Sequence, residues 1–246
     1  MNTYNLWGDA AFRRISLVLT VDFFCSWMLV AALPLVVATR FGAGAELVGS
    51  LALRLLPSPL LAPIVAALLR RSGPRLPVLC SLLVTAVAIP CLAFAPNAMT
   101  VQMTVLVIGT ADAVITPGLL MLRAAVVPAG RNMEANTAFQ AIDRFGKIFG
   151  PPAAGLAVAS ASIEATLATL ALAQIATAVL LVLQPRDRQV QENAAPSHAP
   201  GFEREILAMF RENPVLWALL LPAFGYMVSL GALQPFLFWL NRDQFH

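Results

Sequence analysis

Long, continuous blocks of apolar residues are the feature that most constrains how this chain can fold. Each block is close to the length of about 20 residues that an α-helix needs to cross a hydrocarbon layer. Backbone polar groups cannot stay unpaired in lipid, so each block must be a helix unless the chain forms a closed barrel. Barrel strands alternate apolar and polar side chains, whereas these blocks do not alternate. The sequence therefore predicts an all-α membrane protein with seven spans, at residues 15–39, 47–69, 76–95, 99–122, 138–160, 164–184 and 215–240.

Composition and the start of the chain agree with this interpretation. Only 12% of the residues are charged, about half the share that is usual in a soluble domain. The first apolar block follows Arg13 and Arg14, as the apolar part of a signal peptide would. A signal peptide has only about 7–15 apolar residues at that point, and this block is longer. We therefore interpret it as the first span.

Arginines in the connections predict the orientation, because cytoplasmic loops carry an excess of basic residues. With a cytoplasmic N-terminus, eleven arginines lie in cytoplasmic segments, at positions 13, 14, 70, 71, 75, 123, 131, 186, 188, 204 and 211. Only Arg40 and Arg242 lie outside. Seven spans then put the C-terminus outside, and the predicted location is the cell (inner or plasma) membrane. Because the basic residues mark topology, the net charge of +3 does not indicate nucleic acid.

The spacing of the spans predicts three parts of the chain. Residues 1–184 form a six-helix transmembrane domain. Residues 185–214 are polar and form a cytoplasmic central loop. Residues 215–246 contain the seventh helix.

Ionisable residues inside the spans are the best candidates for a functional site. Asp22 lies about 10 Å from the inner edge, Asp112 about 15 Å and Arg54 about 22 Å, at a rise of 1.5 Å per residue. A charge at mid-bilayer costs about 2.5–3.5 kcal/mol on insertion scales, so it usually faces a cavity or a partner. Asp22 and Asp112 would then face a water-filled path, where one of them binds a proton or a cationic substrate. Burial favours the protonated form of such a carboxyl group.

A structural explanation of these charges stays open beside the functional one. Asp22 could form an ion pair with Arg144 or Lys147 in the fifth span. Arg54 would then hold a packing or gating pair. Asp143 and Arg144 are expected at the membrane interface, in a structural role.

Enzymatic and metal chemistry find little support in the sequence. Cys25, Cys80 and Cys91 each lie in an apolar block without metal-ligand spacing, so we expect free thiols. His198 and His246 have no companion ligands. There is no HExxH, no GxSxG and no phosphate-binding loop. The chain is therefore predicted to be no enzyme and to use neither a cofactor nor a metal.

Two short motifs and one longer stretch together resemble the major facilitator superfamily. The connection ALLRRSGPR resembles the signature of the loop between spans two and three of that family, with Arg71, Gly73 and Arg75 matching. Ala66 replaces the leading glycine and Arg70 the aspartate, so the charge relay of that loop is altered here.

The fifth span, GKIFGPPAAG, resembles the antiporter signature of the same superfamily. Gly146, Gly150, Pro151 and Gly155 match, while Ala154 replaces one glycine. Small residues allow close helix approach, and Gly-Pro bends a span. The stretch from Thr116 to Pro152, with the prolines of span two, resembles drug and siderophore exporters, including the enterobactin and macrolide efflux group.

The resemblance implies a six-helix N-terminal half of a major facilitator-type bundle plus one helix of the second half. It implies a secondary transporter, in which spans one and four line a cavity for the substrate and access alternates. The expected activity is proton-coupled efflux of small molecules, with Asp22, Asp112 and Arg54 as binding candidates. The alternative is a non-transporting membrane subunit that assembles with a partner membrane protein.

The chain ends after one helix of the expected second half. Three explanations are open: a truncated or split product, association with a separately encoded second half, or dimerisation with a second copy. Truncation is the favoured expectation. The expected partners are therefore the lipid bilayer, a small-molecule substrate, protons, and a second half or a second copy.

Overall fold

The computed structural model describes residues 6–41, 45–127 and 130–184, together with Ala218 and Pro222. The chain divides into two compact units, Met1–Ala195 and Pro196–His246. Nearly all the described residues belong to the first unit, which is described here by itself. The predicted central loop and the predicted seventh span lie almost wholly outside the described residues, so the predicted three-part division stays a prediction.

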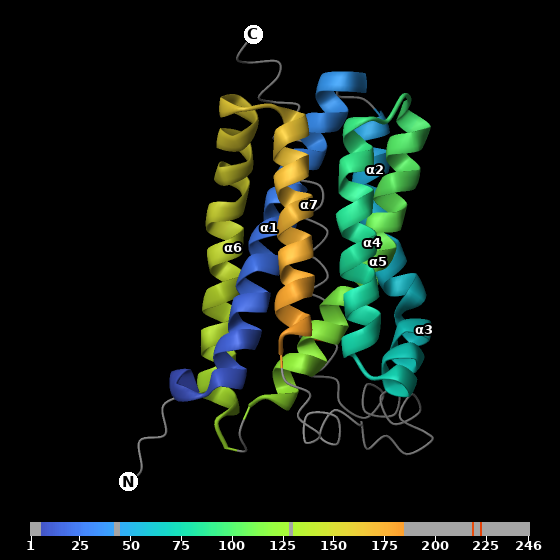
Figure 1. The fold of residues 1–246 in the computed structure, drawn as a ribbon. Helices are drawn as coiled ribbons and strands as arrows, with labels where there is room; N and C mark the ends of the chain where they lie inside the picture. Colours follow the sequence, from blue (N-terminus) through green and yellow to red (C-terminus); the bar gives the residue numbers. More distant parts are fainter. Residues whose placement is uncertain (1–5, 42–44, 128–129, 185–217, 219–221, 223–246) are drawn as a thin grey trace. The chain divides into compact units, whose positions relative to one another are not determined.

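The first unit is an up-and-down bundle of helices (Figure 1). Its elements are η1 (Leu6–Gly8), α1 (Ala10–Phe41), α2 (Ala45–Leu55), α3 (Pro57–Ser72), α4 (Arg75–Ala93), α5 (Ala98–Ala125), α6 (Asn132–Ser160) and α7 (Ile163–Val182). The part of the chain that the structure describes contains no strand, so the all-α prediction is confirmed there. Because the helices alternate in direction, the end of α3 and the starts of α4 and α6 lie at one end of the bundle.

The second span is not the single helix that the sequence predicted. Its hydrogen-bonded helix is interrupted at Leu56, between α2 and α3. Pro57 and Pro59 follow directly, and a proline has no backbone N–H and clashes with the carbonyl group four residues earlier. Pro57 and Pro59 therefore interrupt the hydrogen-bond pattern in the middle of the apolar block, although Leu56 keeps helical angles (φ −58°, ψ −40°) and its N–H donates to the Ala52 carbonyl oxygen at 2.9 Å.

Within residues 6–184, apart from the short gaps that the structure does not describe, five helices are long and apolar enough to cross a membrane. They are α1, α4, α5, α7 and the stretch Ala52–Ser72 around the break. The helix α6 is not among them, because Asp143, Arg144 and Lys147 lower its mean hydropathy. It nevertheless runs along α1 for much of its length (Figure 1).

Glycines bring α6 and α1 close together. A methyl group added at Gly150 would come within 2.7 Å of the Trp27 Cβ atom, and one at Gly146 within 3.0 Å of the Phe23 backbone. The two glycines are one turn apart, so they form one strip of close approach along α6. Small residues give this kind of contact between membrane helices.

Two arginines hold the two ends of α7. At one end, the Arg40 guanidinium forms a salt bridge of 3.1 Å with Glu164 and donates to the Leu92 carbonyl oxygen at the end of α4. At the other end, Arg75 Nη2 donates to the carbonyl oxygens of Leu181, Val182 and Gln184, at 2.6–3.0 Å. These contacts fix α7 against α1 and α4.

Candidate functional site

A partly buried ion pair joins α2 and α5. Arg54 donates from both Nε and Nη2 to the same atom, Asp112 Oδ2, at 3.2 and 3.1 Å. The Arg54 side chain is 10% exposed and the Asp112 side chain 30%. The sequence placed each residue inside a span, and the structure brings them together across 58 positions of the chain. Asp112 is thus a packing or gating partner of Arg54, as the structural explanation of these charges required.

Gly109 is the residue that allows this pair to form. It lies one helical turn before Asp112 on α5, directly against the backbone of Arg54. A methyl group at position 109 would come 2.3 Å from the Arg54 carbonyl oxygen and 2.9 Å from its Cα atom. Only glycine therefore lets α2 lie so close to α5. Gly109 was not among the residues predicted from the sequence, although a glycine in a continuous apolar block is a signal of close approach.

Asp22 lies on α1 and is 4% exposed. Its Oδ1 atom is buried and has no hydrogen-bond partner in the described part of the chain. The carboxyl groups of Asp22 and Asp112 are near enough to interact electrostatically. The three residues Asp22, Arg54 and Asp112 are called the polar centre below.

The ion pair that the structural explanation required for Asp22 is not formed. Lys147 binds Asp143 instead, at 2.6 Å, and its ammonium group lies 5.3 Å from the centre of the Trp27 ring. Arg144 is exposed. The spacing of four residues between Asp143 and Lys147 is typical of helical ion pairs and could have predicted this partner.

Two further buried polar atoms lack a partner among the described residues. They are Gln174 Oε1 on α7 and Ser16 Oγ on α1. The sequence analysis did not select either residue. The signal for Gln174 was available, because it is a lone amide in the apolar block of α7.

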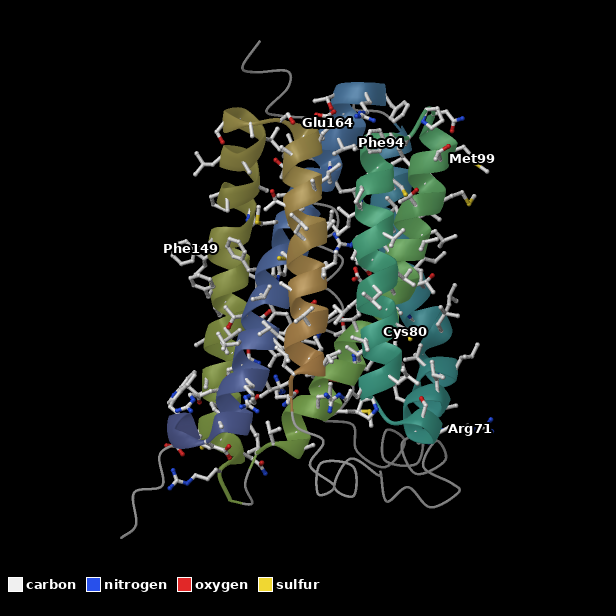
Figure 2. All side chains as sticks on the ribbon, in the orientation of Figure 1. Arg71, Cys80, Phe94, Met99, Phe149 and Glu164 are labelled. Carbon is white, nitrogen blue, oxygen red and sulfur yellow. The ribbon has the colours of Figure 1, made fainter. Side chains whose placement is uncertain are left out.

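The loop-motif residues lie where α3 meets α4: Arg71 in the last turn of α3, Gly73 in the connection and Arg75 at the start of α4. Gly73 ends α3 with a φ of 72°, a left-handed conformation that favours glycine. Arg75 caps the end of α7, as described above. Arg71 points away from the bundle (Figure 2). The matching residues therefore differ in their surroundings, and Arg75 is the one that links two helices.

The four antiporter-like residues all lie on α6. Gly146 and Gly150 form the close contact with α1, whereas no atom lies within 4 Å of a methyl group added at Gly155. Pro151 lies inside α6, which continues as one helix to Ser160. The residues Gly146 and Gly150 thus position the helix that carries Asp22.

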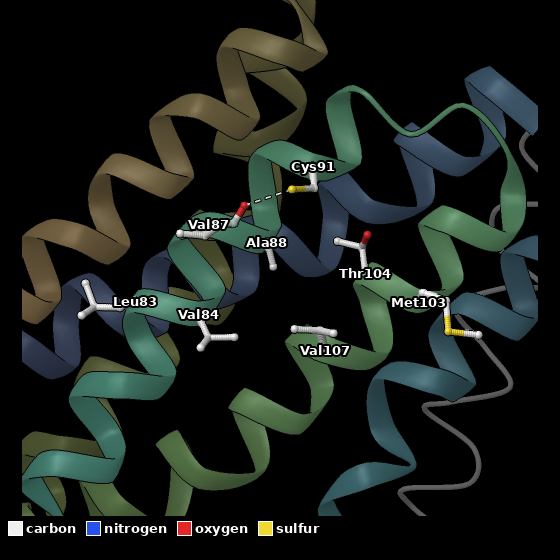
Figure 3. Close-up of a pocket in the computed structure, with 8 residues that line it drawn as sticks. All are labelled: Leu83, Val84, Val87, Ala88, Cys91, Met103, Thr104 and Val107. Carbon is white, nitrogen blue, oxygen red and sulfur yellow. Dashed lines mark hydrogen bonds between the residues drawn. The ribbon is translucent and has the colours of Figure 1, made fainter.

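An open apolar groove of about 570 Å³ lies between α4 and α5 (Figure 3). Its polar side chains bond within their own helices: Thr104 Oγ1 donates to the Thr100 carbonyl oxygen, and Cys91 Sγ donates to the Val87 carbonyl oxygen. The groove therefore offers hydrocarbon surface and no unsatisfied polar atom. Its lining residues are Leu83, Val84, Val87, Ala88, Cys91, Met103, Thr104 and Val107.

The family model described as Major Facilitator Superfamily matches residues 15–246. A comparison with curated proteins finds no match.

Proposed function

Since the chain belongs to the Major Facilitator Superfamily, whose members are membrane transporters, we propose that it exports small molecules in exchange for protons. Asp22 is the proton-binding group in this proposal, and Arg54 and Asp112 contact the substrate. The observation that carries the proposal is the buried Asp22 Oδ1 atom, which has no hydrogen-bond partner in the described part of the chain.

Physical chemistry supports this assignment of roles. An ionised carboxylate without a partner is costly in an apolar interior, so such a group takes up a proton. The Asp22 Oδ1 atom also gains no cationic partner from the nearest basic residues of the spans, because Arg54 binds Asp112 and Lys147 binds Asp143. A residue that binds and releases a proton during transport needs protonated and ionised forms of similar stability.

The resemblance to drug and siderophore exporters suggests export as the direction. The excess of arginines in one set of connections supports a cytoplasmic N-terminus in the cell membrane. Cysteines introduced at the turn near Arg71 should then be protected from an impermeant thiol reagent added outside. Labelling of that turn in intact cells would reverse the proposed orientation.

Reconstituted vesicles test the transport activity. The purified chain is incorporated with a pH-sensitive dye inside, and a panel of amphipathic molecules is added in turn. At least one class of molecule should move protons across the membrane, and the Asp22→Asn variant should not respond. If no molecule in the panel moves protons, alone or with a co-expressed second half, the chain is not such a transporter. A stable crosslinked complex with an unrelated membrane protein would then favour the non-transporting subunit.

A further inference from the structure

Only one edge of the Arg54 guanidinium has a hydrogen-bond acceptor in the polar centre. Guanidinium carries five N–H donors in a flat fork, and two neighbouring nitrogens form each edge of it. Asp112 Oδ2 accepts from Nε and Nη2, which form the side edge. The remaining nitrogen, Nη1, is buried and has no acceptor among the residues that the structure describes. The end edge of the fork, formed by Nη1 and Nη2, therefore lacks an acceptor.

A buried guanidinium nitrogen without an acceptor is unfavourable in free energy, so its presence needs an explanation. Nearly all buried polar groups are hydrogen-bonded, and a charged donor without a partner costs more than a neutral one. The ion pair with Asp112 does not use its full capacity, because a single carboxylate oxygen accepts from both N–H groups of the side edge. A pair that served only to neutralise Arg54 could place two oxygens on two nitrogens.

We infer that the end edge of Arg54 binds an anionic oxygen group, most simply a carboxylate, of the transported molecule. This inference rests on the proposed function and adds the chemical class of the substrate. Arginine suits this role because its fork matches the two oxygens of a carboxylate. An acceptor supplied by the ligand would satisfy Nη1, which no described residue satisfies.

The acid bonded to Arg54 limits how an anion can bind there. Asp112 is the acid bonded to Arg54, and its side chain is 30% exposed, so it can move away. A ligand carboxylate therefore competes with Asp112 for the positive charge of Arg54, although the two acids occupy different edges of the fork. This competition gives the inference a signature that a purely structural pair lacks.

Direct binding of three probes of the same shape tests the inference. Benzoate, benzamide and benzylamine are anionic, neutral and cationic, and each is titrated by calorimetry into the purified full chain at neutral pH. Benzoate should bind saturably, and the other two at least about tenfold more weakly, since charge-assisted bonds are about twice as strong as neutral ones. If benzoate shows no saturable binding, or binds no better than benzamide, the inference is wrong.

Three variants sharpen the test. Arg54→Gln should weaken benzoate binding at least about tenfold, and Arg54→Lys should weaken it less, because lysine keeps the charge without the fork. Asp112→Asn should strengthen it, because the competing carboxylate is lost. Arg40→Gln removes an arginine from the salt bridge with Glu164 and should leave binding unchanged.

The outcomes separate this inference from the proposed function. If Arg54→Gln does not fold, Asp112→Asn still decides, because unchanged or weaker benzoate binding in that variant contradicts the competition. Binding needs no proton gradient, so benzoate can bind normally in a chain that moves no protons. Proton-coupled transport of neutral or cationic molecules alone, unaffected by Arg54→Gln, would overturn the inference and leave the proposed function standing.

Discussion

The two sides of α5 face very different environments. Gly109 and Asp112 lie against α2 in the polar centre, whereas Met103, Thr104 and Val107 line the open groove with α4. At about 100° per residue these two sets fall on opposite sides of the helix. The groove is a large hollow, but its polar atoms are satisfied within their own helices. The polar centre leaves a carboxylate oxygen and a guanidinium nitrogen without partners.

The difference shows that the size of a hollow is a poor guide to function in a membrane protein. Hydrocarbon chains can fill an apolar groove without any specific bond. An unsatisfied charged atom in the same setting is costly, and it persists where a proton or a ligand completes it. We therefore expect changes in the polar centre to alter transport and changes in the groove to have little effect.

The largest effect is expected from Asp22→Asn. The amide has nearly the same shape but cannot carry a proton, so proton flux should fall to the level of empty vesicles while the chain still folds and inserts. Flux is measured with the reconstituted chain and a dye inside the vesicles. The matched control is Glu164→Gln, an acid at the end of α7 with an exposed side chain. Normal transport by Asp22→Asn across a range of pH would remove Asp22 from the mechanism.

A smaller but clear effect is expected from Gly109→Ala. The added methyl group meets the Arg54 backbone, which cannot move as a side chain can. Overpacking of this kind costs about 1–3 kcal/mol of the free energy of unfolding, and the separation of α2 from α5 should also reduce transport. Unfolding in a denaturing detergent series measures the loss.

Gly155→Ala is the control for that experiment, because no atom lies within 4 Å of the added methyl group. It should leave the free energy of unfolding within about 0.5 kcal/mol of the wild-type value. Equal losses in both variants would mean that the close contact of Gly109 with α2 does not matter.

The next effect concerns the end of α7. Arg75→Gln removes a guanidinium that donates to three carbonyl oxygens, so the free energy of unfolding should fall by about 1 kcal/mol, less than for a fully buried charged bond because Arg75 is partly exposed. Arg71→Gln changes a neighbouring arginine that points away from the bundle and should leave unfolding unchanged. The same detergent series compares them. Indistinguishable variants would show that the cap on α7 contributes nothing to stability.

The smallest effect is expected in the groove. Thr104→Val removes a hydroxyl group that bonds only within α5, so transport should be unchanged and the free energy of unfolding should shift by less than about 0.5 kcal/mol. The reconstituted flux and the detergent series both apply. A loss of transport comparable to that of Asp22→Asn would show that transport needs the groove, and that the two sides of α5 do not differ in importance.

The apolar blocks were enough to predict the helices, because length and hydropathy decide what can cross a bilayer. The first and fourth spans agree with α1 and α5 apart from a few residues at each end. The interruption at Leu56 could also have been predicted from the sequence, because Pro57 and Pro59 follow it directly. These prolines were used only for the family resemblance, and their effect on the hydrogen bonds of the helix was not predicted.

The polar centre could be predicted only in part. Asp22, Asp112 and Arg54 were recognisable as charges inside apolar blocks. That Arg54 binds Asp112 depends on how helices far apart in the sequence pack, whereas the pairing of Lys147 with Asp143 follows the local spacing of four residues. No local pattern specifies such a pair across 58 positions. The capping of α7 by Arg75 is likewise a property of the assembled bundle.

Infrared difference spectroscopy of the reconstituted chain tests the central claim most directly, because it observes the proton on Asp22 itself. Spectra are recorded with and without a proton gradient that drives transport. The account predicts a carbonyl-stretch band of a protonated carboxyl group that changes with the gradient and is absent in Asp22→Asn. A band that persists unchanged in Asp22→Asn, or no gradient-dependent carboxyl band at all, would contradict the assignment of Asp22 as the proton carrier.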